Sequence, residues 1–147
     1  MKIALGSDHA GYDGEKPHYK PEIATYIESK GHTVVDCGTN SSEAVDYPDI
    51  ANAVSEAITG GGAERGILIC GTGIGVSMTA NRHTGIRAAV CTNREMGRLS
   101  REHNDANVLC LGRRVISLGE CKEIIDVWLT EPASTVERHV NRVTKMG

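Results

Sequence analysis

Ile67-Leu68-Ile69-Cys70-Gly71-Thr72-Gly73-Ile74-Gly75 joins an aliphatic run to a loop in which every second residue is glycine. A short apolar run bounded by glycine is typical of a buried strand in a parallel sheet. The glycines let the chain turn sharply and leave backbone N–H groups accessible to a bound anion. The stretch therefore predicts a strand that ends in a thiol beside a group of amide donors.

Four more short apolar runs alternate with segments of helical periodicity. The runs are Ile3–Leu5, Thr33–Val35, Ile86–Cys91 and Asn107–Leu111. Helices are expected over 23–31, from Pro48 to Ile58, and over 76–82, Glu95–His103 and Leu118–Leu129. This alternation predicts an α/β fold, a three-layer α/β/α sandwich around a five-stranded parallel Rossmann-like sheet. An extra C-terminal helix is expected over Glu137–Lys145, and its small apolar surface favours packing on a neighbouring subunit.

Length and composition predict one globular domain, residues 1–147, with 39% hydrophobic and 24% charged residues. The net charge of −3 and the 3% aromatic content disfavour nucleic-acid binding, which needs basic surface and stacking platforms. No apolar run approaches the roughly 20 residues of a membrane span. The five cysteines lack a disulfide pattern, and a strand pattern occupies the N-terminus in place of a signal peptide. Both features predict a cytoplasmic location.

Cys70 differs in its position from the other cysteines. Cys91, Cys110 and Cys121 are predicted to be small buried hydrophobic residues, and Cys37 has no partner motif. Cys70 ends a strand beside amide donors, where a thiolate could act as a nucleophile or as a general base. The residues alone leave both roles open, and a turn that needs glycine for its geometry alone is the third alternative.

The glycine loop does not fit the common anion-binding motifs. Val76 stands where a dinucleotide fingerprint needs its third glycine, and also where a cysteine phosphatase loop needs arginine. The lysine of a P-loop and the Gly-x-Ser-x-Gly elbow of hydrolases are missing. No set of His, Cys and carboxylate residues has the spacing of metal ligands, so neither a metal nor a cofactor is expected.

Polar residues also follow other predicted strands, at the edge where parallel sheets bind their ligands. They belong to the stretches Gly6–Gly11, Asp46–Pro48 and Gly112–Arg114. Asp8 with His9 could equally cap a helix, but their position on the same edge as Cys70 favours a role in binding.

Two further groups lie on predicted helices. His103-Asn104-Asp105 ends the fourth helix, where a histidine is often stabilised only by the helix dipole. Arg138 and Arg142 are four residues apart on the last helix. They form either a solvated basic face or a clamp for one phosphate.

Together these motifs resemble the type B ribose-5-phosphate isomerase family, which also contains subunits of galactose-6-phosphate isomerase. The resemblance spans nearly the whole chain. It rests on Gly6–Gly11, Asp46–Pro48, Ile69–Gly75, Ala80-Asn81, Gly85–Ala88, Ser100–Val108 and Arg138-His139. It implies a metal-free aldose–ketose isomerase of the pentose phosphate pathway, which interconverts D-ribose 5-phosphate and D-ribulose 5-phosphate through a cis-enediolate.

The resemblance also implies roles for individual residues. Cys70 is the base that moves a proton between C2 and C1, because Val76 replaces the glutamate that one branch of the family uses. Thr72 hydrogen-bonds near the thiol or the ring oxygen, and His103 opens the sugar ring. The implied substrate contacts are Asp8 and Tyr47 to hydroxyls, and His9, Arg113, Arg138 and Arg142 to phosphate. Gly71, Gly73, Ile74 and Gly75 form the cradle for the enediolate, and Asn104 is a further substrate-binding residue.

The same resemblance implies a homodimer or a tetramer in which the partner subunit donates some of these residues. One segment departs from the family pattern, because Tyr12–Pro21 forms a longer connection broken by prolines. An altered substrate preference or a modified lid is expected there. The alternatives are a hexose 6-phosphate isomerase of the galactose or allose type, and a non-catalytic sugar-phosphate-binding subunit. The second alternative would need neither the thiol nor the histidine.

Overall fold

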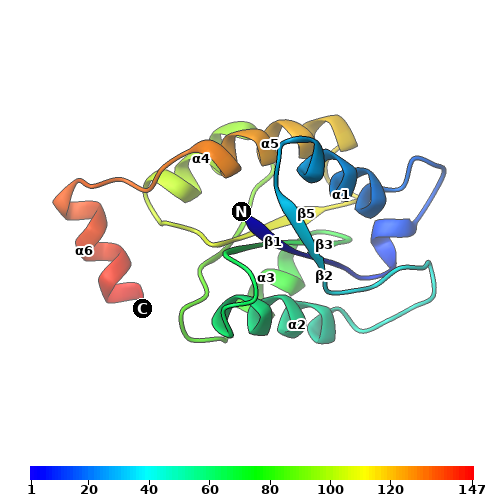
Figure 1. Cartoon of the computed structure of the whole chain (residues 1–147), viewed down its shortest axis with the longest axis horizontal. Coiled ribbons are helices and arrows are strands. Elements are labelled where there is room, and N and C mark those ends of the chain that lie inside the picture. Colours follow the sequence, from blue (N-terminus) through cyan, green and yellow to red (C-terminus); the bar gives the residue numbers. More distant parts are fainter.

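A parallel sheet of five strands lies between two layers of helices in the computed structural model, which describes residues 1–147 (Figure 1). The strands are β1 (Lys2–Ser7), β2 (Thr33–Asp36), β3 (Arg65–Cys70), β4 (Ala88–Val90) and β5 (Val108–Gly112). Their order in the sheet is β2-β1-β3-β5-β4, and every neighbouring pair is parallel. The α/β class and the five parallel strands predicted from the sequence are confirmed.

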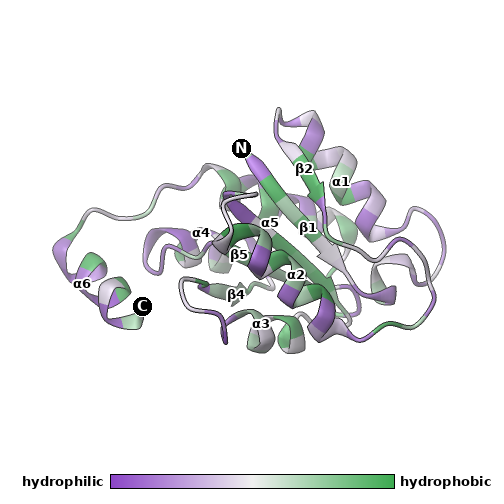
Figure 2. Cartoon of the chain, turned by 60° about the horizontal axis from the view of Figure 1, so that its bottom comes forward, coloured by the Kyte–Doolittle hydropathy of each residue, from purple (hydrophilic) through white to green (hydrophobic).

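The helices divide between the two faces of the sheet. One face is covered by α1 (Tyr19–Ser29), α4 (Arg94–Glu102) and α5 (Leu118–Thr130), and the other by α2 (Tyr47–Thr59) and α3 (Ile74–Ala80). Side chains alternate along each strand, so Ile67 and Ile69 pack toward the first layer while Leu68 and Cys70 pack toward the second. Hydropathy colouring shows the central strands as the most apolar part of the molecule (Figure 2).

The start of α1 differs from the prediction. After the short 3-10 helix η1 (His9–Tyr12), the connection ends at His18, and α1 begins at Tyr19. The prediction that prolines interrupt the chain as far as Pro21 was wrong. Pro21 lies in the first turn of α1, where a backbone N–H has no intrahelical partner in any case, so its absence costs no helical hydrogen bond.

The predicted extra C-terminal helix is α6 (Glu137–Met146), and it extends from one end of the sandwich (Figure 1). His139 is its only buried residue, whereas Val136, Val140 and Met146 are about half exposed. The helix thus contributes little to the core of its own chain. No helix of the chain combines the length and the apolar character needed to cross a membrane.

Candidate active site

The carboxyl ends of β1 and β3 lie side by side, and the chain leaves them in opposite directions. The segment after β1 leads to α1 on one face of the sheet, and the loop after β3 leads to α3 on the other. Such a point in a parallel sheet leaves a crevice in which ligands bind. The Asp8 amide donates to the Ile69 carbonyl at 3.2 Å, so the two loops are joined at the base of this crevice.

The loop after β3 places its polar atoms at the mouth of this crevice. The Cys70 thiol is only 5% exposed, and its Sγ accepts a hydrogen bond from the Gly73 amide at 3.1 Å. The hydroxyl of the exposed Thr72 accepts from the Ile74 amide at 3.2 Å. The amides of Gly71, Thr72 and Gly75 donate to no other backbone group of the chain. The loop therefore combines one buried sulfur with several uncommitted N–H donors.

Two glycines make this loop geometry possible. Gly73 has a positive φ of 81° and precedes the first residue of α3, which begins two residues earlier than predicted. Gly112, at the end of β5, lies against the loop backbone, where a Cβ would come within 2.6 Å of the Thr72 carbonyl oxygen. A side chain at Gly112 would push the loop away from the sheet.

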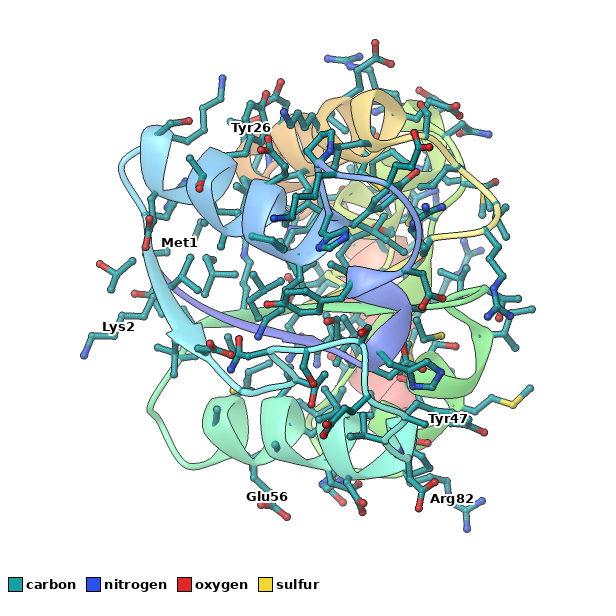
Figure 3. The ribbon with its side chains drawn as sticks, turned by 90° about the vertical axis from the view of Figure 1, so that its right-hand side faces the viewer. Met1, Lys2, Tyr26, Tyr47, Glu56 and Arg82 are labelled. Carbon is teal, nitrogen blue, oxygen red and sulfur yellow. The ribbon has the colours of Figure 1, made fainter.

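Three predicted binding residues surround the same crevice. Asp8 is buried and caps η1, because its carboxylate accepts from the Ala10 amide at 2.9 Å. The capping role weighed for Asp8 is thus present. His9 accepts from the Val45 amide at 3.3 Å through its Nδ1. Tyr47 begins α2, and its ring lies over Gly75, where a Cβ would meet it at 2.6 Å (Figure 3).

Two arginines follow β5 at this edge. The Arg113 amide donates to the Cys70 carbonyl at 2.9 Å, while its side chain turns toward Tyr19. The Arg114 side chain lies over Gly71 and pairs with the carboxylate of Asp13 at 3.7 Å. The sequence prediction omitted Arg114 from the site. The sequence offered one signal for Arg114, because it directly follows Arg113 beyond the end of a predicted strand.

The remaining predicted residues lie at the opposite edge of the sheet. Cys70 is in register with Gly112, whereas His103 and Asn104 precede Val108, the first residue of β5. The length of β5 from Val108 to Gly112 places the two edges about 13 Å apart, at roughly 3.3 Å per residue. Arg138 and Arg142 are exposed on α6, which lies on the left in Figure 1, while η1 and the loop after β2 lie on the right. One chain therefore does not bring Cys70 and His103 together.

His103 has its own polar surroundings at that edge. Its ring centroid is 4.3 Å from that of His139 on α6, and both rings line one hollow with Glu102 and Ser134. Partial burial, together with the nearby His103, Arg138 and Arg142, lowers the pKa of His139. The half-exposed His103 imidazole thus lies near two guanidinium groups and beside the Glu102 carboxylate, where it can exchange a proton with a ligand.

Comparison with known proteins fits this arrangement. The family described as Ribose/Galactose Isomerase matches residues 3–146. The chain belongs to this family. Ribose-5-phosphate isomerase B of Escherichia coli is 48% identical over 128 residues, which cover 87% of this chain and 83% of that protein.

Further comparisons agree with this isomerase family. A solved structure of Clostridium thermocellum ribose-5-phosphate isomerase B has a TM-score of 0.93 and 51% identity, and covers 100% of this chain and 95% of that one. Galactose-6-phosphate isomerase subunit LacB of Clostridium acetobutylicum is 40% identical over 129 residues, covering 88% of this chain and 72% of that protein. The chain is thus an isomerase of the ribose-5-phosphate isomerase B type.

Cys70 is the thiol of this isomerase that ends β3 beside the loop 71–75. All five cysteines are free, and Cys91, Cys110 and Cys121 are buried as predicted. Burial raises the pKa of the Cys110 thiol well above its usual range and that of Cys121 to about 12. Those thiols are therefore protonated at neutral pH and face the core.

Asp105 fixes the turn that carries His103 and Asn104 in this isomerase. It is the only residue other than glycine with a positive φ, at 46°. Its Oδ1 accepts from the buried Arg101 at 2.8 Å and its Oδ2 from Arg87 at 3.2 Å. Arg87 also donates to the Asp105 carbonyl at 2.9 Å. The two arginines thus hold the turn in a conformation that most side chains disfavour.

The Asp105→Ala variant is expected to lose about 2–4 kcal/mol of unfolding free energy, because it strands the Arg101 charge and strains a positive φ. Asp105→Asn should lose about half as much, since asparagine tolerates this conformation and keeps one oxygen acceptor. Urea unfolding of both variants measures the difference. Equal stability of wild type and Asp105→Ala would show that the two arginines do not hold the turn.

Proposed function

We propose that the isomerase interconverts D-ribose 5-phosphate and D-ribulose 5-phosphate through a cis-enediolate. The observation that carries this proposal is the buried Cys70 sulfur at the switch point of the sheet, beside uncommitted amides of the loop 71–75. Proton transfer next to a carbonyl needs a base at the carbon and donors at the oxygen that becomes negative. The loop supplies both within a few residues.

In the proposed reaction, the Cys70 thiolate removes the proton from C2 of the open-chain aldose while O1 gains negative charge. The amides of Gly71 and Gly75 stabilise that charge, and one such donor is typically worth about 3 kcal/mol. The O2 proton of the cis-enediolate passes to O1, and the thiol returns its proton to C1 as the C2 carbonyl forms. Val76 supports this assignment, because it is fully buried in the core and offers no alternative base. Thr72 lies exposed at the mouth, where its hydroxyl can contact the ring oxygen.

We further propose that His103 of a second chain opens the sugar ring, because an imidazole readily passes a proton near neutral pH. The separation of the two edges within one chain supports a homodimer with shared sites. In a two-fold dimer, a surface on one chain meets a different surface on its partner twice, which gives two equivalent composite sites. The exposed Val140 and Met146 of α6, with Val136 directly before the helix, supply apolar surface for such contacts.

The phosphate is assigned to cationic groups from both edges. His9 and Arg114, whose exposed side chain lies over Gly71, would approach it from the chain that carries Cys70, whereas the Arg113 guanidinium is turned toward Tyr19. Arg138 and Arg142 would approach it from the partner, as exposed guanidinium groups that form no ion pair in their own chain. Guanidinium groups suit this task because they bind phosphate through paired hydrogen bonds.

An assay of ribose 5-phosphate beside galactose 6-phosphate and allose 6-phosphate tests the proposed substrate. The kcat/KM for ribose 5-phosphate is expected to be at least about tenfold higher, since an extra carbon must be accommodated in a shaped pocket. Resemblance to the LacB subunit keeps the hexose 6-phosphates as the second candidate. Strong turnover of a hexose phosphate without turnover of ribose 5-phosphate would reverse the assignment. Binding without any turnover would favour a non-catalytic subunit.

A further inference from the structure

Lys20 is a buried charge that the proposed chemistry does not use. It lies in the first turn of α1 and is only 3% exposed. Its Nζ donates to Oδ1 of Asp36 at 2.6 Å, to the Thr39 carbonyl at 2.8 Å and to Oδ1 of Asn40 at 2.8 Å. An ammonium group has three N–H donors, and burying its charge is costly unless they are satisfied. All three acceptors belong to the end of β2 and the loop that follows it, so Lys20 ties α1 to this loop.

The loop after β2 continues the pairing with β1 beyond the end of β2. The Ser7 amide donates to the Gly38 carbonyl at 2.8 Å, and the Thr39 amide donates to the Ser7 carbonyl at 2.5 Å. Lys20 binds the carbonyl of the same Thr39. Ser7 directly precedes Asp8, which caps the short helix η1. The Lys20 ammonium therefore supports the point from which η1 begins.

The other end of η1 is held by the same group of contacts. Tyr12 is the last residue of η1, and its hydroxyl donates at 3.3 Å to Oδ1 of Asn40, the atom that also accepts from Lys20. Within η1, Gly11 packs against the Lys20 side chain, since a Cβ at Gly11 would lie 3.2 Å from the Lys20 Cβ. Both ends of this one-turn helix are thus fixed relative to the Lys20 ammonium.

His9, the first residue of η1, contacts the segment that leads to α2. Its Nδ1 accepts from the Val45 amide at 3.3 Å, and the ring of Tyr47, two residues further on, lies over Gly75. Figure 3 faces this edge of the molecule and shows η1 above the labelled Tyr47. Because Nδ1 accepts a hydrogen bond, Nε2 carries the proton of the neutral ring and can donate to a phosphate oxygen. The orientation of η1 decides where this donor points.

We propose that Lys20 is the positioning residue for His9, because it fixes η1 in the orientation that presents His9 Nε2 to the phosphate group of the substrate. This inference rests on the proposed function, which takes His9 as a phosphate contact. A single helical turn has too few internal hydrogen bonds to hold its own conformation, so contacts from outside must supply the order. Order that exists before the substrate arrives lowers the cost of binding. Lys20 has no hydrogen bond to the loop 71–75, so the proton-transfer step is unaffected.

Lys20→Met tests this role, because it removes the ammonium and keeps most of the side-chain volume. KM for ribose 5-phosphate and the dissociation constant of inorganic phosphate, measured by phosphorus NMR titration, should both rise by about tenfold, with kcat within about threefold. In a His9→Ala background, the rise caused by Lys20→Met should shrink to about twofold or less, because the group that Lys20 positions is gone. A loss of kcat alone, or an equal rise in both backgrounds, would show a purely structural role and overturn the proposal.

Asn40→Ala provides a second variant, since Asn40 is exposed and outside the core. It removes the atom that Lys20 and Tyr12 share. Both constants should rise by about threefold, and only while His9 is present. This variant keeps the proposal testable where Lys20→Met fails to fold, and unchanged constants would then overturn it.

Lys30→Met is the matched control at the other end of the same helix. Lys30 directly follows α1, is exposed, and pairs with Asp126 at 3.4 Å. Neither constant should change in this variant. A rise equal to that of Lys20→Met would contradict the proposal.

His9→Ala alone separates the two levels of the argument. If it leaves both constants unchanged, the phosphate role of His9 is wrong, and Lys20 has no binding group to position. If it raises both constants while Lys20→Met and Asn40→Ala do not, only the positioning role is wrong.

Discussion

Cys70→Ala is expected to lower kcat for ribose 5-phosphate by about 100- to 10,000-fold, the range that a positioned general base contributes. The methyl group cannot accept a proton, and the fully buried Val76 offers no substitute. Exchange of the substrate C2 proton with solvent deuterium reports this step directly. Exchange should be rapid in wild type and nearly lost in the variant, while KM changes little because the loop amides and the arginines remain.

Cys37→Ala is the matched control, because Cys37 is a half-buried free thiol that follows β2, and β1 lies between β2 and β3. Its exchange rate should equal that of wild type. Circular dichroism and the unfolding midpoint of Cys70→Ala should show that the variant remains folded. Undiminished deuterium exchange in folded Cys70→Ala would remove Cys70 as the base and would leave the thiol a structural role.

Mixing Cys70→Ala with His103→Asn is expected to recover activity that neither variant has alone. In a mixed dimer, one composite site carries both substitutions, whereas the other contains the intact Cys70 of one chain and the intact His103 of its partner. Random exchange of equal amounts makes half of the dimers mixed, so about a quarter of wild-type activity should return. Subunit exchange followed by an isomerase assay, with native mass spectrometry to count mixed dimers, measures this recovery.

The control mixture combines Cys70→Ala with Thr72→Val. Both residues belong to the same loop, so every site in a mixed dimer keeps one defect and no recovery is expected. Absence of recovery for Cys70→Ala with His103→Asn, in the presence of mixed dimers, would contradict the shared site. In that case, His103 would have to act on a substrate bound to the Cys70 loop of its own chain.

Local sequence patterns predicted the elements of the fold well. Aliphatic runs such as Ile67–Ile69 become strands because backbone buried on both faces needs apolar side chains at every position. Pro48 lies in the first turn of α2, one residue after its start, and Cys70 ends β3 as predicted. The boundaries near Pro21 and Ile74 were less accurate. Pro21 is tolerated in a first turn, and α3 begins directly after the positive φ of Gly73.

The sequence by itself determined the α/β class, the strand that ends at Cys70, and a loop rich in amide donors, because these depend on the order of neighbouring residues. Only the tertiary structure decided that Cys70 and His103 occupy opposite edges of the sheet and that the Arg113 guanidinium packs against the Tyr19 ring. These distances depend on strand order and helix direction. Contacts between residues far apart in the chain establish both. Hydrophobic periodicity specifies which face of an element is buried, but not which distant element covers it.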